Sequence, residues 1–183
     1  MKKYQKDYEL ILKTKANGKI KEEVKYIGDY YVSQLNDETL KIKKILYFAL
    51  SLSSVIVLIL LGIINTSSSR VLYVALPYVC MFPPAIYSLI GSIQFLKLEN
   101  RIEYVKYDKT RNRVRKSTLG MIVISLLTII GDAFFIFYHY PINKFLIELI
   151  FLTGLIFLLT INAFFLHQIK RQEIFKREEA VKQ

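Results

Sequence analysis

Long uncharged stretches of apolar residues alternate with polar, charged segments along the chain. Four stretches reach the roughly 20 residues that a helix needs to cross about 30 Å of hydrocarbon at 1.5 Å per residue. They are Ile45–Ile64, Val71–Leu96, Leu119–Tyr138 and Phe145–Leu166. Because lipid offers the backbone no hydrogen-bond partner, each must be helical. The pattern predicts an all-α membrane protein, a four-transmembrane-helix bundle.

The polar segments between these stretches set the predicted organisation. Residues 65–70 and 139–144 are too short to form a domain, so the spans pair as two helical hairpins. The predicted parts are an N-terminal segment (1–44), a first transmembrane hairpin (45–96), a basic loop (97–118), a second transmembrane hairpin (119–168) and a tail (169–183).

The N-terminal segment carries a pattern with a period of two residues. Asn17-Gly18 separates two runs with a period of two residues, which are Tyr8, Leu10 and Leu12 on one side and Ile20, Glu22, Val24 and Tyr26 on the other. Asn-Gly flanked in this way predicts a small N-terminal β-hairpin. An isolated two-stranded hairpin is marginal in water, so we expect another surface to cover it.

Two further segments have expected structures. Asn36 or Asp37 can cap a helix that continues into the first span. The tyrosines before it, Tyr26, Tyr30 and Tyr31, suit the lipid headgroup layer as interfacial anchors. Mixed charges at helical spacing predict that the tail extends the fourth span as a helix.

The charges decide the orientation. The chain has 26 Lys and Arg against 15 Asp and Glu, and 24 of those basic residues lie in segments 1–44, 97–118 and 169–183. Positive residues near span ends resist translocation, so both termini and the middle loop are expected in the cytoplasm. Heavy use of Lys and Ile and the absence of Trp suggest an AT-rich bacterial genome, and hence the bacterial cytoplasmic membrane.

The middle loop concentrates basic side chains beside a span. Basic and aromatic residues together can bind nucleic acid. A basic segment next to a span favours anionic lipid headgroups instead. The expected headgroup contacts are Lys106, Arg111, Arg113, Arg115 and Lys116.

Ionisable residues inside spans are costly and are functional candidates. Asp132 and Glu148 fall at similar depth in the outer half of the third and fourth spans. The candidate intramembrane polar cluster comprises Arg70, Tyr73, Tyr78, Asp132, His139 and Glu148. In it, Arg70 or Lys144 would pair with Asp132 or Glu148. The alternative is that such pairs only lock helices together.

Three prolines interrupt the second span. Pro77, Pro83 and Pro84 each remove a backbone donor and clash with the preceding turn, which predicts a break or kink near Phe82. A kink can be purely structural. The freed carbonyls of broken helices can also coordinate ions.

Catalytic chemistry has little to draw on in this sequence. Cys80 is the one cysteine, and His139 and His167 fall at opposite faces of the membrane. We therefore expect no cofactor, no metal and no enzymatic activity. The expected function is an accessory, immunity-type or partner-binding component of a membrane complex, associated with another membrane protein or with itself. The alternative is a small oligomeric transporter or channel subunit that uses the kinked second helix and Asp132.

Overall fold

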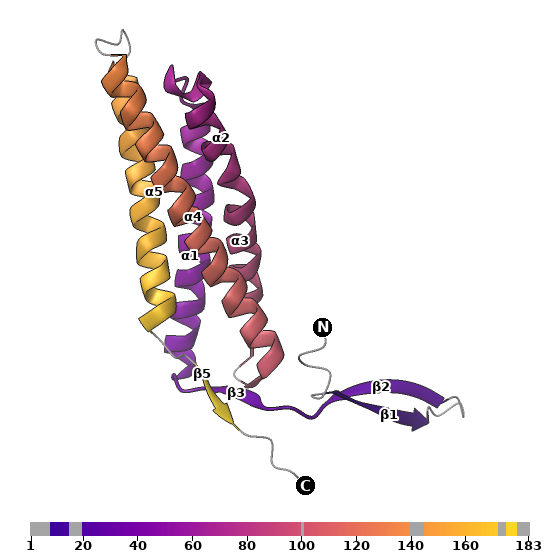
Figure 1. Ribbon diagram of the computed structural model, residues 1–183. Helices are drawn as coiled ribbons and strands as arrows, with labels where there is room; N and C mark the ends of the chain where they lie inside the picture. Colours follow the sequence, from indigo (N-terminus) through magenta and orange to yellow (C-terminus); the bar gives the residue numbers. More distant parts are fainter. Residues whose placement is uncertain (1–7, 15–19, 100, 140–144, 172–174, 179–183) are drawn as a thin grey trace.

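The fold consists of a long helical bundle with two small sheets at one end (Figure 1). The computed structural model describes residues 8–14, 20–99, 101–139, 145–171 and 175–178. The elements are β1 (Tyr8–Thr14), β2 (Ile20–Tyr26), β3 (Tyr30–Ser33), α1 (Asp37–Ile63), the 3₁₀ turn η2 (Ser68–Arg70), α2 (Leu72–Cys80), α3 (Phe82–Leu96), β4 (Arg101–Glu103), α4 (Tyr104–Tyr138), α5 (Phe145–Arg171) and β5 (Phe175–Glu178).

Four helical stretches are long and apolar enough to cross a membrane, judged by length and composition. They are Asp37–Ile63, Leu72–Leu96, Tyr104–Tyr138 and Phe145–Lys170. This confirms the four predicted spans and indicates an integral membrane protein. Three of them begin before or end after the predicted apolar limits, because helices continue into polar sequence once nucleated.

The start of α1 follows from a local signal. The Asn36 side chain accepts a hydrogen bond from the backbone N–H of Asp37 at 2.9 Å, and Asp37 and Glu38 place negative charge in the first turn. Both features compensate the unpaired N–H groups and the positive dipole end of a helix. The polar residues before Ile45 therefore belong to α1.

The second span consists of two helices. α2 ends at Cys80 and α3 begins at Phe82, with Met81 between them and Pro83 and Pro84 in the first turn of α3. Proline suits the first turn of a helix, where the missing N–H has no intrahelical acceptor. The division lies one residue before Phe82, the position at which the sequence predicts a break.

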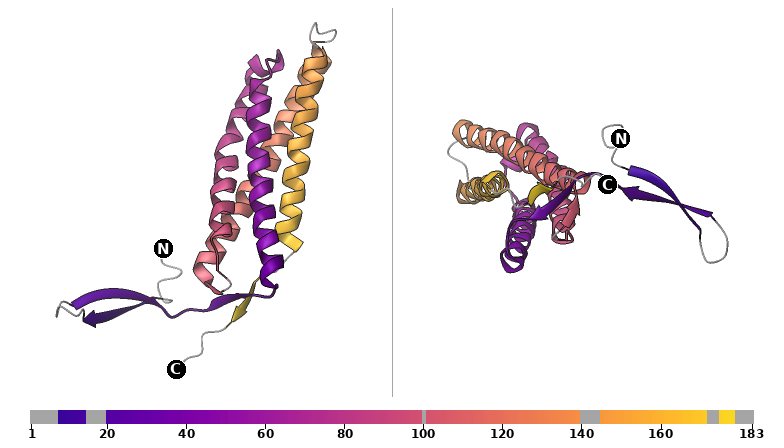
Figure 2. Two further views of the ribbon diagram at one scale, coloured as in Figure 1. Left: turned by 180° about the vertical axis from the view of Figure 1, so that it is seen from behind. Right: turned by 90° about the horizontal axis from the view of Figure 1, so that it is seen from below.

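The helices pack around a common interior (Figure 2). α1 packs against α3 and α5, and α4 packs against α2, α3 and α5. Two apolar clusters fill the interior. One lies toward the sheets and includes Leu40, Tyr47, Phe95, Leu98, Ile102, Tyr107, Val114, Phe165 and Ile169. The other lies toward η2 and includes Leu58, Leu61, Val74, Met81, Ala85, Met121, Phe151, Leu155 and Leu158. We call these two ends of the bundle the sheet end and the loop end.

The predicted N-terminal hairpin is present as the antiparallel pair β1–β2, in register Tyr8 with Tyr26 and Thr14 with Ile20. Its Asn17-Gly18 turn lies outside the described residues. In Figures 1 and 2 the hairpin points away from the bundle.

A second sheet, not predicted, joins three distant segments in the order β4-β3-β5. Both pairings are antiparallel, with Tyr31 opposite Ile102 on one side and Arg177 on the other. Such pairings span about 70 and 145 residues of sequence, and no local pattern encodes them. The prediction of a helical tail was wrong at residues 175–178, which form β5.

The predicted basic loop 97–118 is also largely helical. α4 begins at Tyr104 and runs for 35 residues, about 52 Å at 1.5 Å per residue. The first turns bury Val105, Tyr107, Thr110 and Val114, so an apolar stripe continues through the basic sequence. The charges of that stretch obscured its 3.6-residue periodicity.

Candidate functional site

A buried carboxylate organises the loop end of the bundle. Glu148, in the first turn of α5, is fully buried. Its Oε1 accepts hydrogen bonds from the backbone N–H groups of Ser67 at 2.6 Å and Ser68 at 3.3 Å, and its Oε2 accepts one from Ser68 Oγ at 2.7 Å. The carboxylate thus caps the N-terminus of η2 and joins α5 to the α1–α2 connection.

The hydroxyl-rich sequence Thr66-Ser67-Ser68-Ser69 makes this cap possible. Thr66 Oγ1 accepts from the backbone N–H of Ser69 at 3.1 Å and lies 3.3 Å from Ser68 Oγ. Ser69 Oγ donates to the Thr66 carbonyl at 2.9 Å. Short hydroxyl side chains bond nearby backbone and so favour turns and caps. Thr66 and Ser68 are not among the site residues predicted from the sequence, although the Thr-Ser-Ser-Ser run is a turn signal.

Asp132, on α4, is the second buried carboxyl group here. It is fully buried, and neither of its oxygens has a hydrogen-bond partner among the described residues. Ser68 and Glu148 are polar neighbours of Asp132. Asp132 and Glu148 therefore meet at η2, with Ser68 between them.

The basic partner expected for these carboxyl groups lies elsewhere. Arg70 is exposed, and its Nη2 donates to Asn65 Oδ1 at 3.0 Å. This geometry does not support a pair between Arg70 and either acid. Lys144, the other candidate partner, lies outside the described residues.

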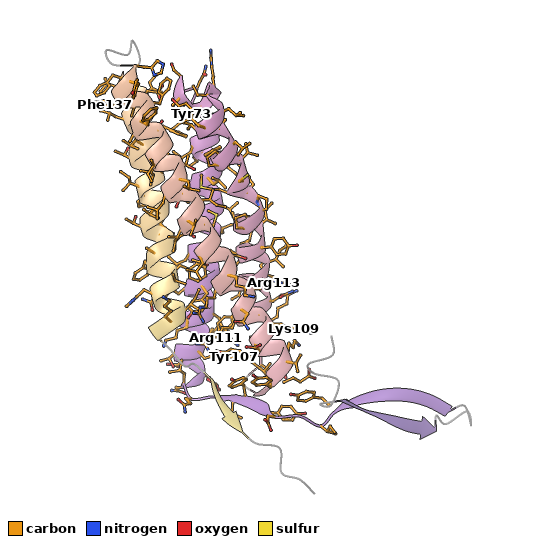
Figure 3. All side chains as sticks on the ribbon, in the orientation of Figure 1. Tyr73, Tyr107, Lys109, Arg111, Arg113 and Phe137 are labelled. Atoms are coloured by element: carbon orange, nitrogen blue, oxygen red, sulfur yellow. The ribbon has the colours of Figure 1, made fainter. Side chains whose placement is uncertain are left out.

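The side chains of the remaining predicted cluster members contact other groups. His139 is exposed and its ring stacks on Phe135 with centroids 4.4 Å apart. Tyr73 is 43% exposed at the bundle surface (Figure 3). Tyr78 Oη donates to the Leu58 carbonyl inside the bundle. The Tyr78 hydrogen bond joins α2 to α1. Of the predicted six, Asp132 and Glu148 are the two that share Ser68 as a polar neighbour.

The backbone of α2 lies close to α4 at Gly131, the residue before Asp132. A Cβ on Gly131 would lie 3.0 Å from the carbonyl oxygen of Tyr73. That carbonyl precedes Pro77 by four residues, and proline has no N–H with which to bond it. The proline thus leaves a carbonyl beside α4 at the residue next to Asp132.

A polar layer also lies between the two apolar clusters. Each helix that reaches this level contributes small or amide side chains that are buried, namely Ser51, Ser54, Ser88, Ser92, Thr118 and Asn162. Asn162 Nδ2 donates to the Leu158 carbonyl at 2.8 Å, and Ser54 Oγ lies 3.5 Å from Asn162 Oδ1. Ser88 Oγ and Ser92 Oγ have no partner within the described part of the chain. Asn162, a polar residue in an apolar span, could have been singled out from the sequence.

The basic residues lie along the sheet end of α4. Lys106, Arg115 and Lys116 are exposed, while Arg111 and Arg113 are partly covered. Arg113 Nη1 donates to Gln94 Oε1 of α3 at 3.0 Å, and Figure 3 shows Lys109, Arg111 and Arg113 near this end. The group forms a basic collar, by which we mean Lys106, Arg111, Arg113, Arg115 and Lys116.

The tyrosines before α1 join the sheet to the bundle. The ring of Tyr31 stacks on Tyr104 at 5.4 Å and tilts against Tyr107 at 4.7 Å. Tyr26 is buried, and its Oη donates to the Asp29 carbonyl at 2.8 Å. The expectation that these rings serve as headgroup anchors does not describe Tyr26 and Tyr31, which pack within the protein.

Few other groups gather in a way that suggests chemistry. In the described ranges, no three or more His, Cys, Asp or Glu side chains are grouped to hold a metal ion. His139 follows α4 at the loop end, and His167 lies in the last two turns of α5 toward the sheet end. Comparisons with protein-family models, curated proteins and solved structures give no match.

Proposed function

We propose that this protein is a non-enzymatic component of a membrane complex, which binds a partner protein through its β1–β2 hairpin. The observation that carries the proposal is the hairpin itself. It is two-stranded, and it extends away from the bundle (Figures 1 and 2). A hairpin of this size is marginal in water without a surface to cover it.

The register of the hairpin supports a docking role. The pairs Leu10–Val24 and Thr14–Ile20 alternate with Glu9–Lys25 and Lys13–Lys21. Because residues two apart share a face of a ladder, apolar residues predominate on one face and charged residues on the other. The apolar face suits contact with another membrane protein or with a second copy of this chain.

Orientation and lipid contact belong to the same proposal. With the sheet end in the cytoplasm of a bacterium, the basic collar faces the anionic headgroups of the inner leaflet. Each basic residue near such a surface contributes about 1 kcal/mol. The collar would hold the bundle at a fixed depth and present the hairpin close to the membrane. Nucleic acid is not the proposed partner.

Site-specific crosslinking in native membranes tests the docking role. A photoreactive amino acid in place of Leu12 should give a protein adduct, and one in place of Leu76, an exposed residue of α2, should not. The adduct should be lost in Leu10→Asp and kept in Lys13→Ala, because these residues occupy opposite faces of the ladder. An adduct that survives Leu10→Asp, or none at all from position 12, contradicts the proposal.

A second candidate is a small oligomeric transporter or channel subunit. The observation that favours it is the fully buried Asp132 beside a span divided at Met81. Four spans rarely enclose a pathway, so an oligomer is required. Ion flux into proteoliposomes that is abolished by Asp132→Asn would establish this function, and absence of flux for the wild type would exclude it.

A further inference from the structure

The Asp132 carboxyl group and its neighbour Ser68 Oγ both act as hydrogen-bond acceptors here. Ser68 Oγ carries one proton, and its 2.7 Å contact with Glu148 Oε2 takes that proton. Ser68 therefore has only lone pairs to offer Asp132, whose two oxygens have no donor among the described residues. A buried polar group without a partner is rare and costly. A positive species between Asp132 and Ser68 removes this cost.

The charges around Asp132 also favour a bound cation. Glu148 accepts three hydrogen bonds and Asp132 lies beside it, so two acidic groups share one buried place. Arg70 is the basic residue of η2, and its side chain donates a hydrogen bond to Asn65 at the surface. The arginine of η2 therefore does not neutralise the two carboxyl groups at the loop end.

The Tyr73 carbonyl supplies a further oxygen. Pro77 cannot donate to it, and it lies against Gly131, the residue before Asp132. Helices that are broken or kinked in the membrane expose backbone carbonyls. These carbonyls can coordinate Na⁺ or accept a hydrogen bond from a protonated group. Small cations with hard character prefer such carboxylate, hydroxyl and carbonyl oxygens.

The geometry points to a site for a monovalent cation, either Na⁺ or a proton, formed by the Asp132 carboxyl group, Ser68 Oγ and the Tyr73 carbonyl. Glu148 is a positioning residue, because it holds Ser68 with its lone pairs toward Asp132. The inference is independent of partner binding by the hairpin. It requires occupancy of the site only, not transport through it.

Infrared spectroscopy and thermal unfolding of the purified full-length protein in lipid nanodiscs test the site. With choline as the only added cation, wild type should show a protonated-carboxyl band that Asp132→Asn lacks. Addition of Na⁺ should remove that band and raise the unfolding midpoint by about 5 °C between roughly 1 and 200 mM. Asp132→Asn should show no response to Na⁺.

The two cations give distinct results. A band that Na⁺ removes means that Na⁺ replaces a proton, and a band that Na⁺ leaves unchanged identifies the proton as the occupant. A protein with neither a band that depends on Asp132 nor a response to Na⁺ overturns the inference. So does a response to Na⁺ that persists in Asp132→Asn.

A pair of proline variants separates binding from packing. Pro77→Ala restores an N–H that can bond the Tyr73 carbonyl, so the apparent affinity for Na⁺, or the position of the carboxyl band where the proton is the occupant, should change. Pro83→Ala removes a proline from the start of α3, away from the site, and should change neither. Equal behaviour of the two variants removes the Tyr73 carbonyl from the site and contradicts the geometry proposed.

Discussion

At the residue scale, the best-defined polar interaction is the cap that Glu148 places on η2. Its carboxylate satisfies two backbone N–H groups and one hydroxyl in a buried position. Charge-assisted hydrogen bonds of this kind are about twice as strong as neutral ones. The cap ties α5 to the connection between α1 and α2, so it fixes one helical hairpin against the other.

Glu148→Gln should lower the free energy of unfolding by about 1–2 kcal/mol, because the amide keeps one acceptor oxygen and loses the charge. Glu148→Ala should cost about 3 kcal/mol or more, since three donors lose their acceptor. Chemical unfolding in mixed micelles measures both values. Thr153→Ala, an exposed site on the same helix, is the control and should change stability by less than about 0.5 kcal/mol. Equal losses for Gln and Ala would contradict a role for the acceptor oxygens.

Both acids were predictable from the sequence, but their contacts were not. Asp132 and Glu148 were recognisable because ionisable residues are rare in spans. Ser68, which neighbours both acids, lies in the short connection between α1 and α2. The length of that connection does not indicate a site. The positive charge of Arg70 predicts it as the partner of these acids. An exposed arginine, however, is stabilised by Asn65 and water, and it would lose hydration free energy if it were buried beside a carboxylate.

At the element scale, close contact between α3 and α4 depends on small residues. A Cβ on Gly91 would lie 2.6 Å from Cγ2 of Val114, whereas one on Gly120 would lie 3.6 Å from Cβ of Pro84. The first distance requires displacement of a stiff β-branched side chain. The second is an ordinary van der Waals contact.

Gly91→Ala should therefore destabilise the bundle by about 1–3 kcal/mol through overpacking. Gly120→Ala should be neutral or stabilising by up to about 1 kcal/mol, because alanine favours the helix. Unfolding of both variants in the same detergent gives the comparison. A destabilisation by Gly120→Ala as large as that by Gly91→Ala would show that helix packing differs from the one described.

The three-stranded sheet makes a prediction about the tail. Truncation after Arg171 removes β5, so β3 keeps β4 as its one ladder partner. Backbone amides of residues 30–33 should then exchange hydrogen faster, by about tenfold or more, while amides in α1 and α5 keep their protection. Hydrogen exchange read by mass spectrometry measures this. Unchanged exchange in residues 30–33 would contradict the β3–β5 pairing.

The elements were predictable in proportion to their local signals. The spans and the N-terminal hairpin followed from hydrophobic runs and from Asn17-Gly18 between alternating residues. The β4-β3-β5 sheet did not, because its short strands of three or four residues pair across the whole chain. The helical start of α4 was visible in Val105, Tyr107, Thr110 and Val114, but the surrounding charges obscured it.

At the scale of the whole molecule, the arrangement separates two polar regions. Both sheets lie at one end of the bundle (Figure 1). The basic collar lies on the half of α4 toward that end, and the buried acids lie beside η2 at the other end. The excess of Lys and Arg gives a formal charge of +11 and lies mostly in the segments of the sheet end. We propose that this asymmetry orients the protein, with the sheet end retained in the cytoplasm.

Cysteine accessibility tests this orientation, on which the proposed roles of the hairpin and the collar depend. The native cysteine is first replaced by Cys80→Ser, because Cys80 is exposed. Two exposed positions, one at each end, are then changed separately as Asn65→Cys and Gln34→Cys. In intact cells a membrane-impermeant maleimide should label the Asn65→Cys protein and should label the Gln34→Cys protein only after permeabilisation. Labelling of Gln34→Cys in intact cells, or equal labelling of both, would contradict the account.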